Sequence, residues 1–200
     1  MNWSLATEDA LSEAVGVRLL LEHGIVPSQL LKREGFGYLK SRANSWQEIA
    51  RRRPVLVLTD LDRASCPPAL RSDWFGTDEL SPWLCFRVAV REIESWLLAD
   101  HAAVRQLWAR RCALPEEPEM LPDPKRHLLE LAMQAPRALR DDLVRIEAGR
   151  PRQAPGYNAR LAAWVQDAWH PARAARRAPS LSRARDRVAQ FAARARSGGG

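Results

Sequence analysis

The chain has 200 residues, of which 46% are hydrophobic, enough for one substantial α/β domain and a smaller helical addition. We expect a cytoplasmic protein that does not enter a membrane, because no uninterrupted apolar stretch approaches the roughly 20 residues that span a bilayer and the first residues do not follow the pattern of a signal peptide. The formal net charge of +7 lies entirely in residues 171–200, so residues 1–170 are balanced in charge and a uniformly basic surface is excluded.

Strand and helix patterns alternate through the first sixty residues. Residues 3–7 read as a first strand, and residues 9–23 carry apolar side chains at helical spacing. A short strand over residues 35–40 and a helix over residues 43–53 are expected next. The apolar run at residues 55–59 then has the continuous hydrophobic character of a strand that is buried on both faces. This alternation predicts a parallel sheet with right-handed crossovers.

The rest of the chain is predicted to be mainly helical. Residues 63–82 read as a long loop, residues 83–90 as a further strand, and residues 95–100 as part of a helix. Prolines mark a linker near residues 113–124, and helical patterns then cover residues 125–133, 136–148, 158–169 and 181–196. We therefore expect an α/β domain over residues 1–112, with a mostly parallel sheet flanked by helices, and a helical C-terminal portion with a basic tail over residues 113–200.

Acidic residues follow three of the predicted strands at the point where each strand ends. Asp60 and Asp62 come directly after the central run, Glu8 follows the first strand, and Glu92 and Glu94 follow the strand at residues 83–90. Because ligands bind at the carboxyl ends of parallel strands, we expect these side chains to form one site. If the backbone stays extended through Asp62, its carboxylate points to the same side as that of Asp60, with the Cα atoms about 7 Å apart.

A divalent cation would explain such a pair of acidic side chains. Two carboxylates about 4 Å apart repel by roughly 4 kcal/mol at an effective dielectric near 20, so one would have to protonate unless a cation bridges them. Mg²⁺ or Mn²⁺ is the simplest choice, with Glu92 as an additional ligand. Two alternatives stay open: Asp60 and Asp62 cap a turn, and Glu92 and Glu94 are favourable charges in the first turn of a helix.

Four segments carry a resemblance to a known family: residues 8–13, 58–62, 90–100 and 123–125. In these segments the chain resembles the TOPRIM-like proteins related to the overcoming-lysogenisation-defect (OLD) nucleases, and more narrowly a bacterial branch expected beside a partner ATPase. The short TOPRIM pattern is a glutamate after the first strand and Asp-x-Asp after the third, here Glu8, Asp60 and Asp62. The resemblance implies a TOPRIM-like, Rossmann-like fold.

The resemblance also implies an activity. Glu8, Asp60 and Asp62 would bind Mg²⁺ and support phosphodiester hydrolysis on DNA or RNA, with DNA favoured. The chain would be the nuclease effector of a bacterial defence or toxin-like system that works with an AAA- or ABC-type ATPase. The family usually has glycine after the glutamate, where this chain has Asp9. Asp9 is then either a further ligand or the mark of a site that has moved away from catalysis.

Basic and aromatic residues complete the predicted site. Arg91 and Lys125 are candidates for stabilising charge in the transition state, and Glu94 belongs to the same catalytic set. The alternative is that these cations form ion pairs with Glu94 or Asp123. Four further residues are expected to contact nucleic acid: Arg63, Trp74, Arg183 and Arg187.

Two non-enzymatic readings compete with the nuclease. One is a TOPRIM-like scaffold that docks on an ATPase and contributes binding or regulation. The other is a nucleic-acid-binding module that acts through the eight arginines of residues 171–200. The same tail also fits a solvated amphipathic helix that docks inward through Leu181, Val188 and Phe191.

Overall fold

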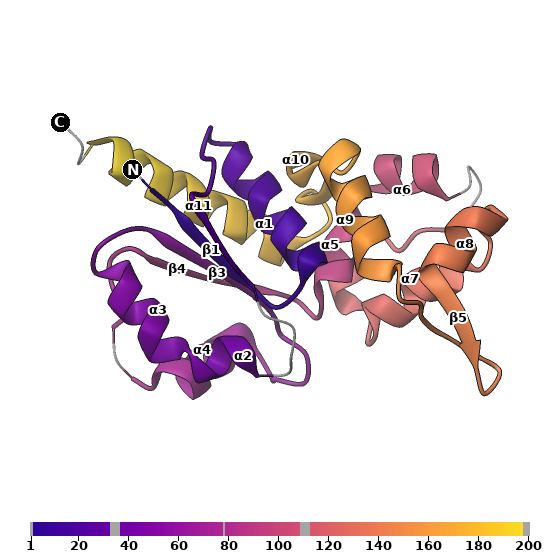
Figure 1. Cartoon of the computed structure of the whole chain (residues 1–200), viewed down its shortest axis with the longest axis horizontal. Helices are drawn as coiled ribbons and strands as arrows, with labels where there is room; N and C mark the ends of the chain where they lie inside the picture. Colours follow the sequence, from indigo (N-terminus) through magenta and orange to yellow (C-terminus); the bar gives the residue numbers. More distant parts are fainter. Residues whose placement is uncertain (1, 33–36, 78, 109–112, 198–200) are drawn as a thin grey trace.

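The protein is described by a computed structural model that covers residues 2–32, 37–77, 79–108 and 113–197. A four-stranded parallel sheet in the order β2-β1-β3-β4 lies at its centre (Figure 1). The strands are β1 (Ser4–Thr7), β2 (Gln29–Lys32), β3 (Val55–Asp60) and β4 (Leu84–Ala89). The predicted α/β class with a parallel sheet is confirmed.

Apolar side chains alternate between the two faces of the sheet and so hold a helical layer on each. Val55 and Val57 of β3 pack on one side, against helices α2 (Tyr38–Ser41), α3 (Ala43–Ala50) and α4 (Pro67–Phe75). Leu56 lies on the other side, in a cluster with side chains of α1 (Ala10–Leu21) and α11 (Pro179–Ser197). Figure 1 shows these two layers on opposite sides of the strands.

A helical lobe extends from the carboxyl edge of the sheet. It contains α5 (Ile93–Ala99), α6 (His101–Leu107), η1 (Pro118–Met120), α7 (Pro124–Ala132), α8 (Arg137–Leu143), α9 (Tyr157–Asp167) and α10 (Pro171–Ala174). One hydrophobic cluster joins Leu11 and Val15 of α1 to Trp96 of α5 and Leu161 of α9. The core therefore crosses the boundary predicted near residue 112, and α11 returns to cover the sheet (Figure 1).

Two elements near the sheet differ from the prediction. The strand after α1 is Gln29–Lys32 rather than residues 35–40, of which residues 35 and 36 lie outside the described part and Tyr38–Ser41 is helical. This edge strand is largely exposed and has no buried hydrophobic run by which to recognise it. The predicted loop at residues 63–82 contains α4, which begins with two prolines in its first turn, where proline is tolerated.

A β-hairpin replaces the end of the helix predicted over residues 136–148. Helix α8 ends at Leu143, and β5 (Val144–Glu147) then pairs antiparallel with β6 (Arg150–Gln153). The two-residue turn has positive φ at both positions, 50° at Ala148 and 72° at Gly149, which matches the twist of a hairpin. Ala-Gly is a weak turn signal compared with Asn-Gly, and the exposed strands give little hydrophobic pattern.

None of the described helices has the length and apolar character that a membrane crossing requires.

Candidate active site

Acidic side chains that follow three strands lie near one another at the carboxyl edge of the sheet. Asp60 is the last residue of β3, and its Oδ1 accepts a 2.8 Å hydrogen bond from the backbone N–H of Ile93, the first residue of α5. Glu8 follows β1, and its Oε1 accepts a 2.7 Å hydrogen bond from the hydroxyl of Thr59. These two bonds tie the ends of β1, β3 and β4 together around the carboxyl groups.

The backbone does not stay extended through Asp62, so the geometry predicted for the Asp60–Asp62 pair is wrong. Strand β3 ends at Asp60, and Asp62 has a left-handed φ of 49°. The N–H groups of Leu61 and Asp62 both donate to the carbonyl of Arg91, which curls the chain at this point. Asp62 nonetheless lies near enough to raise the pKa of Glu8.

Asp9 has a structural role at the start of α1. Its backbone is extended, with φ −143° and ψ 179°, a conformation that does not require the glycine usual in the TOPRIM pattern. One carboxyl oxygen caps the helix by accepting from the N–H of Ser12 at 2.8 Å. The other accepts from the side-chain amide of Asn158 at 3.3 Å. Both oxygens of Asp9 are therefore engaged within the protein.

Glu94 lies at the centre of the most buried part of the site. Its side chain is 1% exposed, and its Oε1 lies 3.5 Å from Nζ of Lys125. The same oxygen accepts a 3.0 Å hydrogen bond from the hydroxyl of Tyr157, which reaches it from α9. Among the described residues, Oε2 of Glu94 has no hydrogen-bond partner.

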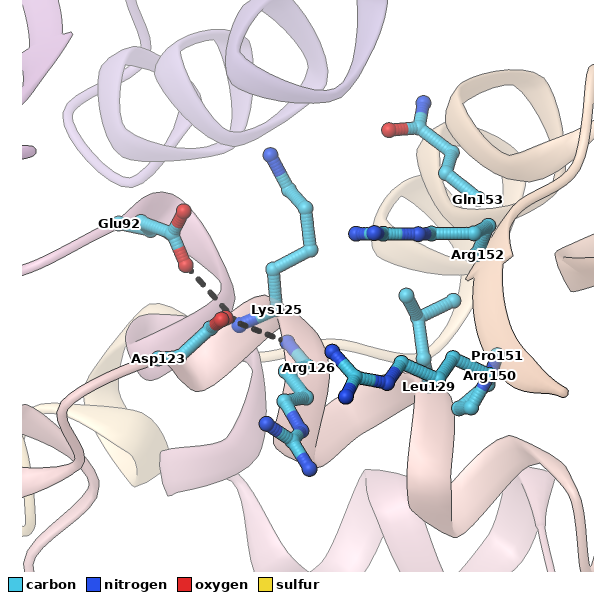
Figure 2. A pocket seen from close by; sticks show the side chains of 9 residues that line it. All are labelled: Glu92, Asp123, Lys125, Arg126, Leu129, Arg150, Pro151, Arg152 and Gln153. Atoms are coloured by element: carbon cyan, nitrogen blue, oxygen red, sulfur yellow. Dashed lines mark hydrogen bonds between the residues drawn. The ribbon is translucent and has the colours of Figure 1, made fainter. Parts of the chain in front are cut away.

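Lys125 reaches the acidic groups from across the proline-rich segment and lies beside Glu94, the ion pair that was the alternative to a catalytic role. Its backbone N–H, at the start of α7, donates a 3.0 Å hydrogen bond to Oε2 of Glu92 (Figure 2). Burial alone would lower the pKa of Lys125, but the carboxyl groups of Glu94, Glu92 and Asp60 outweigh it and raise that pKa above its usual range. Lys125 is therefore held in its charged form.

Burial raises the pKa of three carboxyl groups at this edge. The pKa of Glu94 rises to about 7 because the group is desolvated, although Lys125 opposes the shift. Desolvation also raises the pKa of Asp60 well above its usual range, and the nearby Glu94 adds to the effect. Burial raises the pKa of Glu8 too, against the hydrogen bond from Thr59. One lysine does not offset this concentration of acidic groups, so an additional cation would be stabilising.

The donor chemistry of this edge fits a hard divalent cation, although the side chains do not form a closed ligand set. Within residues 2–32, 37–77, 79–108 and 113–197, no three Asp, Glu, His or Cys side chains are grouped closely enough to hold a metal ion. Mg²⁺, however, is often held by only one or two carboxylates, with waters and substrate phosphates as its other ligands. Glu8 and Asp60 would supply such carboxylates, and the unpartnered oxygen of Glu94 lies buried in the same cluster.

Three further residues of the predicted site differ in what they contact: Arg91, Arg63 and Trp74. The guanidinium of Arg91 donates 3.2 Å hydrogen bonds to the carbonyls of Asp62 and Ala64, so it holds the turn after β3. Arg63 is exposed in that turn. Trp74 lies in α4 rather than in a loop, and its ring packs 5.1 Å from that of Phe86. This packing explains Trp74 without a ligand.

The basic tail forms an amphipathic helix that docks inward, which is one of the two alternatives predicted for it from the sequence. Leu181, Val188 and Phe191 of α11 are buried. The helix starts at the carboxyl edge of the sheet, where the hydroxyl of Ser180 lies 3.3 Å from the N–H of Val90, and its last turns reach Pro82 before β4. Arg183 and Arg187 are exposed along it, and Arg187 lies over the ring of Phe191 at 4.7 Å. Most of the basic tail therefore leads away from the carboxyl groups.

Several residues that contact the carboxyl groups at this edge belong to no motif by which the sequence could predict them. Thr59, Tyr157 and Asn158 contact the acidic side chains, and they come from β3 and from a helix more than sixty residues away.

Comparison with protein-family models, with curated proteins and with solved structures gives no match. The resemblance to TOPRIM-like proteins therefore rests on the motif residues alone.

Proposed function

We propose that the chain is a Mg²⁺- or Mn²⁺-dependent phosphodiester hydrolase that acts on nucleic acid, with DNA as the favoured substrate. The observation that carries this proposal is the gathering of three carboxyl groups, Glu8, Asp60 and Glu94, after strand ends and beside Lys125, where burial also raises the pKa of each. Perturbed acidic groups of this kind cluster at functional sites. Their position at the carboxyl edge of a parallel sheet is where ligands of α/β folds bind.

In this proposal the side chains have distinct roles. Glu8 and Asp60 would hold the ion, whose chemistry is to neutralise a phosphate and lower the pKa of a bound water. Lys125 would offer a permanent positive charge to the oxygens that become negative as the phosphodiester is attacked. Glu94 and Tyr157 would position Lys125, because Glu94 contacts the ammonium group and Tyr157 fixes the carboxyl group of Glu94.

The test is a plasmid-nicking assay with Mg²⁺ or Mn²⁺. We expect wild type to nick DNA, Asp60→Asn and Lys125→Met to lose at least a hundredfold in rate, and the exposed Asp141→Asn control to retain the wild-type rate. Nicking that persists in purified Asp60→Asn would contradict the assignment, since the activity would then come from another site or a contaminant.

A binding-only role is the second candidate, and two observations favour it. The carboxyl groups of the described residues are not grouped closely enough to hold a metal ion by themselves, and both oxygens of Asp9 accept hydrogen bonds within the protein. In that case DNA or a partner would bind without being cleaved. DNA binding by wild type in a metal-containing buffer, with no nicked product over hours, would support this role. The ATPase partner implied by the resemblance stays a prediction, to be tested by co-purification.

A further inference from the structure

A pocket of about 370 Å³ opens next to the carboxyl groups, between α7 and the β5–β6 hairpin. Its wall carries four cations, Lys125, Arg126, Arg150 and Arg152, and two carboxylates, Glu92 and Asp123. Figure 2 shows Arg150 and Arg152 reaching from β6 across the pocket toward α7. The pocket borders the acidic site, because Lys125 lines the pocket and its Nζ lies 3.5 Å from Oε1 of Glu94.

The two carboxylates of the pocket are already used by the protein. Asp123 caps α7 by accepting a 2.7 Å hydrogen bond from the backbone N–H of Arg126, and Glu92 accepts from the backbone N–H of Lys125 (Figure 2). The side chain of Arg126 pairs with Glu130 at an exposed position, which is a weak interaction. The pocket therefore keeps an excess of positive charge.

Arg150 and Arg152 supply the cations that are free to bind a ligand. Within the described part of the chain, no acidic side chain lies within salt-bridge distance of either guanidinium, and both residues are exposed. Arg145 of β5, by contrast, pairs with Glu147 on its own strand. Because side chains two apart in a strand point to the same face, Arg150 and Arg152 present their guanidinium groups on one side of β6, with their Cα atoms about 7 Å apart.

We propose that the β5–β6 hairpin and the first turn of α7 bind the phosphodiester backbone of a DNA strand and lead it to the carboxyl groups at the edge of the sheet. Guanidinium groups bind phosphate oxygens in a bidentate manner, and a line of them matches the repeated charges of a backbone. The basic wall of the pocket favours a negatively charged ligand, and a ligand that also reaches the neighbouring carboxyl groups has to be extended, as a nucleic-acid strand is. This path rests on the proposed function for its direction, but the binding surface itself can be tested separately.

Fluorescence anisotropy with a labelled DNA duplex that has a single-stranded extension, in EDTA to prevent cleavage, tests the binding surface. We expect Arg150→Ala/Arg152→Ala to weaken binding about tenfold or more and to reduce the slope of log K against log salt by about 2, one unit for each lost phosphate contact. Arg150→Lys/Arg152→Lys should restore most of the slope, because it keeps both charges.

A matched control removes the same charge elsewhere. Arg51→Ala/Arg52→Ala, between α3 and β3, deletes two exposed arginines that lie outside the pocket, so it should leave the salt slope close to that of wild type. Loss of binding in this variant together with wild-type binding in the hairpin variant would overturn the proposal. Equal, small effects in both variants would overturn it too, since the attraction would then come from the overall charge.

The two proposals fail in different ways. If the hairpin variant loses binding while wild type shows no cleavage with any metal, the hydrolase proposal fails and the binding surface stands. If wild type cleaves and the hairpin variant binds and cleaves normally, the binding surface fails and the hydrolase stands.

Discussion

The hydroxyl of Tyr157 donates a 3.0 Å hydrogen bond to the same oxygen of Glu94 that lies 3.5 Å from Nζ of Lys125. Three helices, α5, α7 and α9, therefore meet at one carboxyl group that is 1% exposed. A buried charge with two partners on one oxygen and none described on the other is a poor device for stability alone, because the desolvation cost is not fully offset. It suits a site that receives a further positively charged ligand.

Removing the Tyr157 hydroxyl should destabilise the protein. Tyr157→Phe takes away a hydrogen bond to a buried carboxyl group, and we expect the free energy of unfolding to fall by about 1–3 kcal/mol in chemical denaturation. Tyr38→Phe is the matched control, because Tyr38 is only half-buried and packs through its ring against Trp46. A change below about 0.5 kcal/mol in Tyr157→Phe would show that Glu94 does not depend on this bond.

Stability in EDTA should fall as the pH rises from about 4.5 to 7. Burial raises the pKa of Glu94 to about 7 in the folded protein, against an ordinary value of 4.5, so within that window the folded state binds more protons than the unfolded state. The stabilisation that Glu94 contributes is therefore fully present below about pH 4.5. It is lost as the pH rises through the folded pKa of about 7. Lys125 stays charged throughout and adds no slope.

The variant Glu94→Gln isolates this contribution. It should flatten part of the decline between pH 5 and 8, an effect of up to roughly 3 kcal/mol by linkage. The remaining decline has the same sign, because burial also raises the pKa of Asp60 and Glu8. An unchanged profile in Glu94→Gln, measured by denaturant unfolding at several pH values, would show that Glu94 is ionised in the folded protein across the range.

The ion pair between Asp100 and Arg173 should hold α10 against α5. The guanidinium of Arg173 makes two hydrogen bonds of 2.8 and 2.9 Å to the carboxylate of Asp100, which is 1% exposed and also accepts from the backbone N–H of His170. Arg173→Ala should cost about 2–4 kcal/mol, because it leaves a buried carboxylate without its cation. Arg137→Ala, which breaks an exposed pair, should cost less than about 0.5 kcal/mol by the same measurement.

The parallel sheet could be predicted because its central strands are buried on both faces. The run at residues 55–59 has the continuous hydrophobic pattern of a strand in a parallel sheet. Because ligands bind at the carboxyl ends of such strands, the acidic residues after this run could be assigned to a candidate site. The edge strand Gln29–Lys32 and the hairpin at residues 144–153 could not be predicted in the same way, since exposed strands are free of the hydrophobic pattern on which such predictions depend.

The carboxyl groups of the site could be predicted, but their partners could not. Glu8, Asp60 and Glu94 follow strands, so local pattern places them at one edge. Tyr157 reaches Glu94 only because α9 packs on α1, and no local signal in the sequence predicts that contact. The left-handed turn at Asp62 is likewise set by hydrogen bonds to the carbonyl of Arg91, about thirty residues away.

Metal binding at the acidic edge is the central claim, and thermal unfolding with increasing Mn²⁺ tests it most directly. At 100 times its dissociation constant the ion should stabilise wild type by about 2.7 kcal/mol. Asp60→Asn should abolish this stabilisation, because it removes the charge while its amide oxygen can still accept the hydrogen bond from Ile93. Stabilisation of equal size in both proteins, or in neither, would contradict the account.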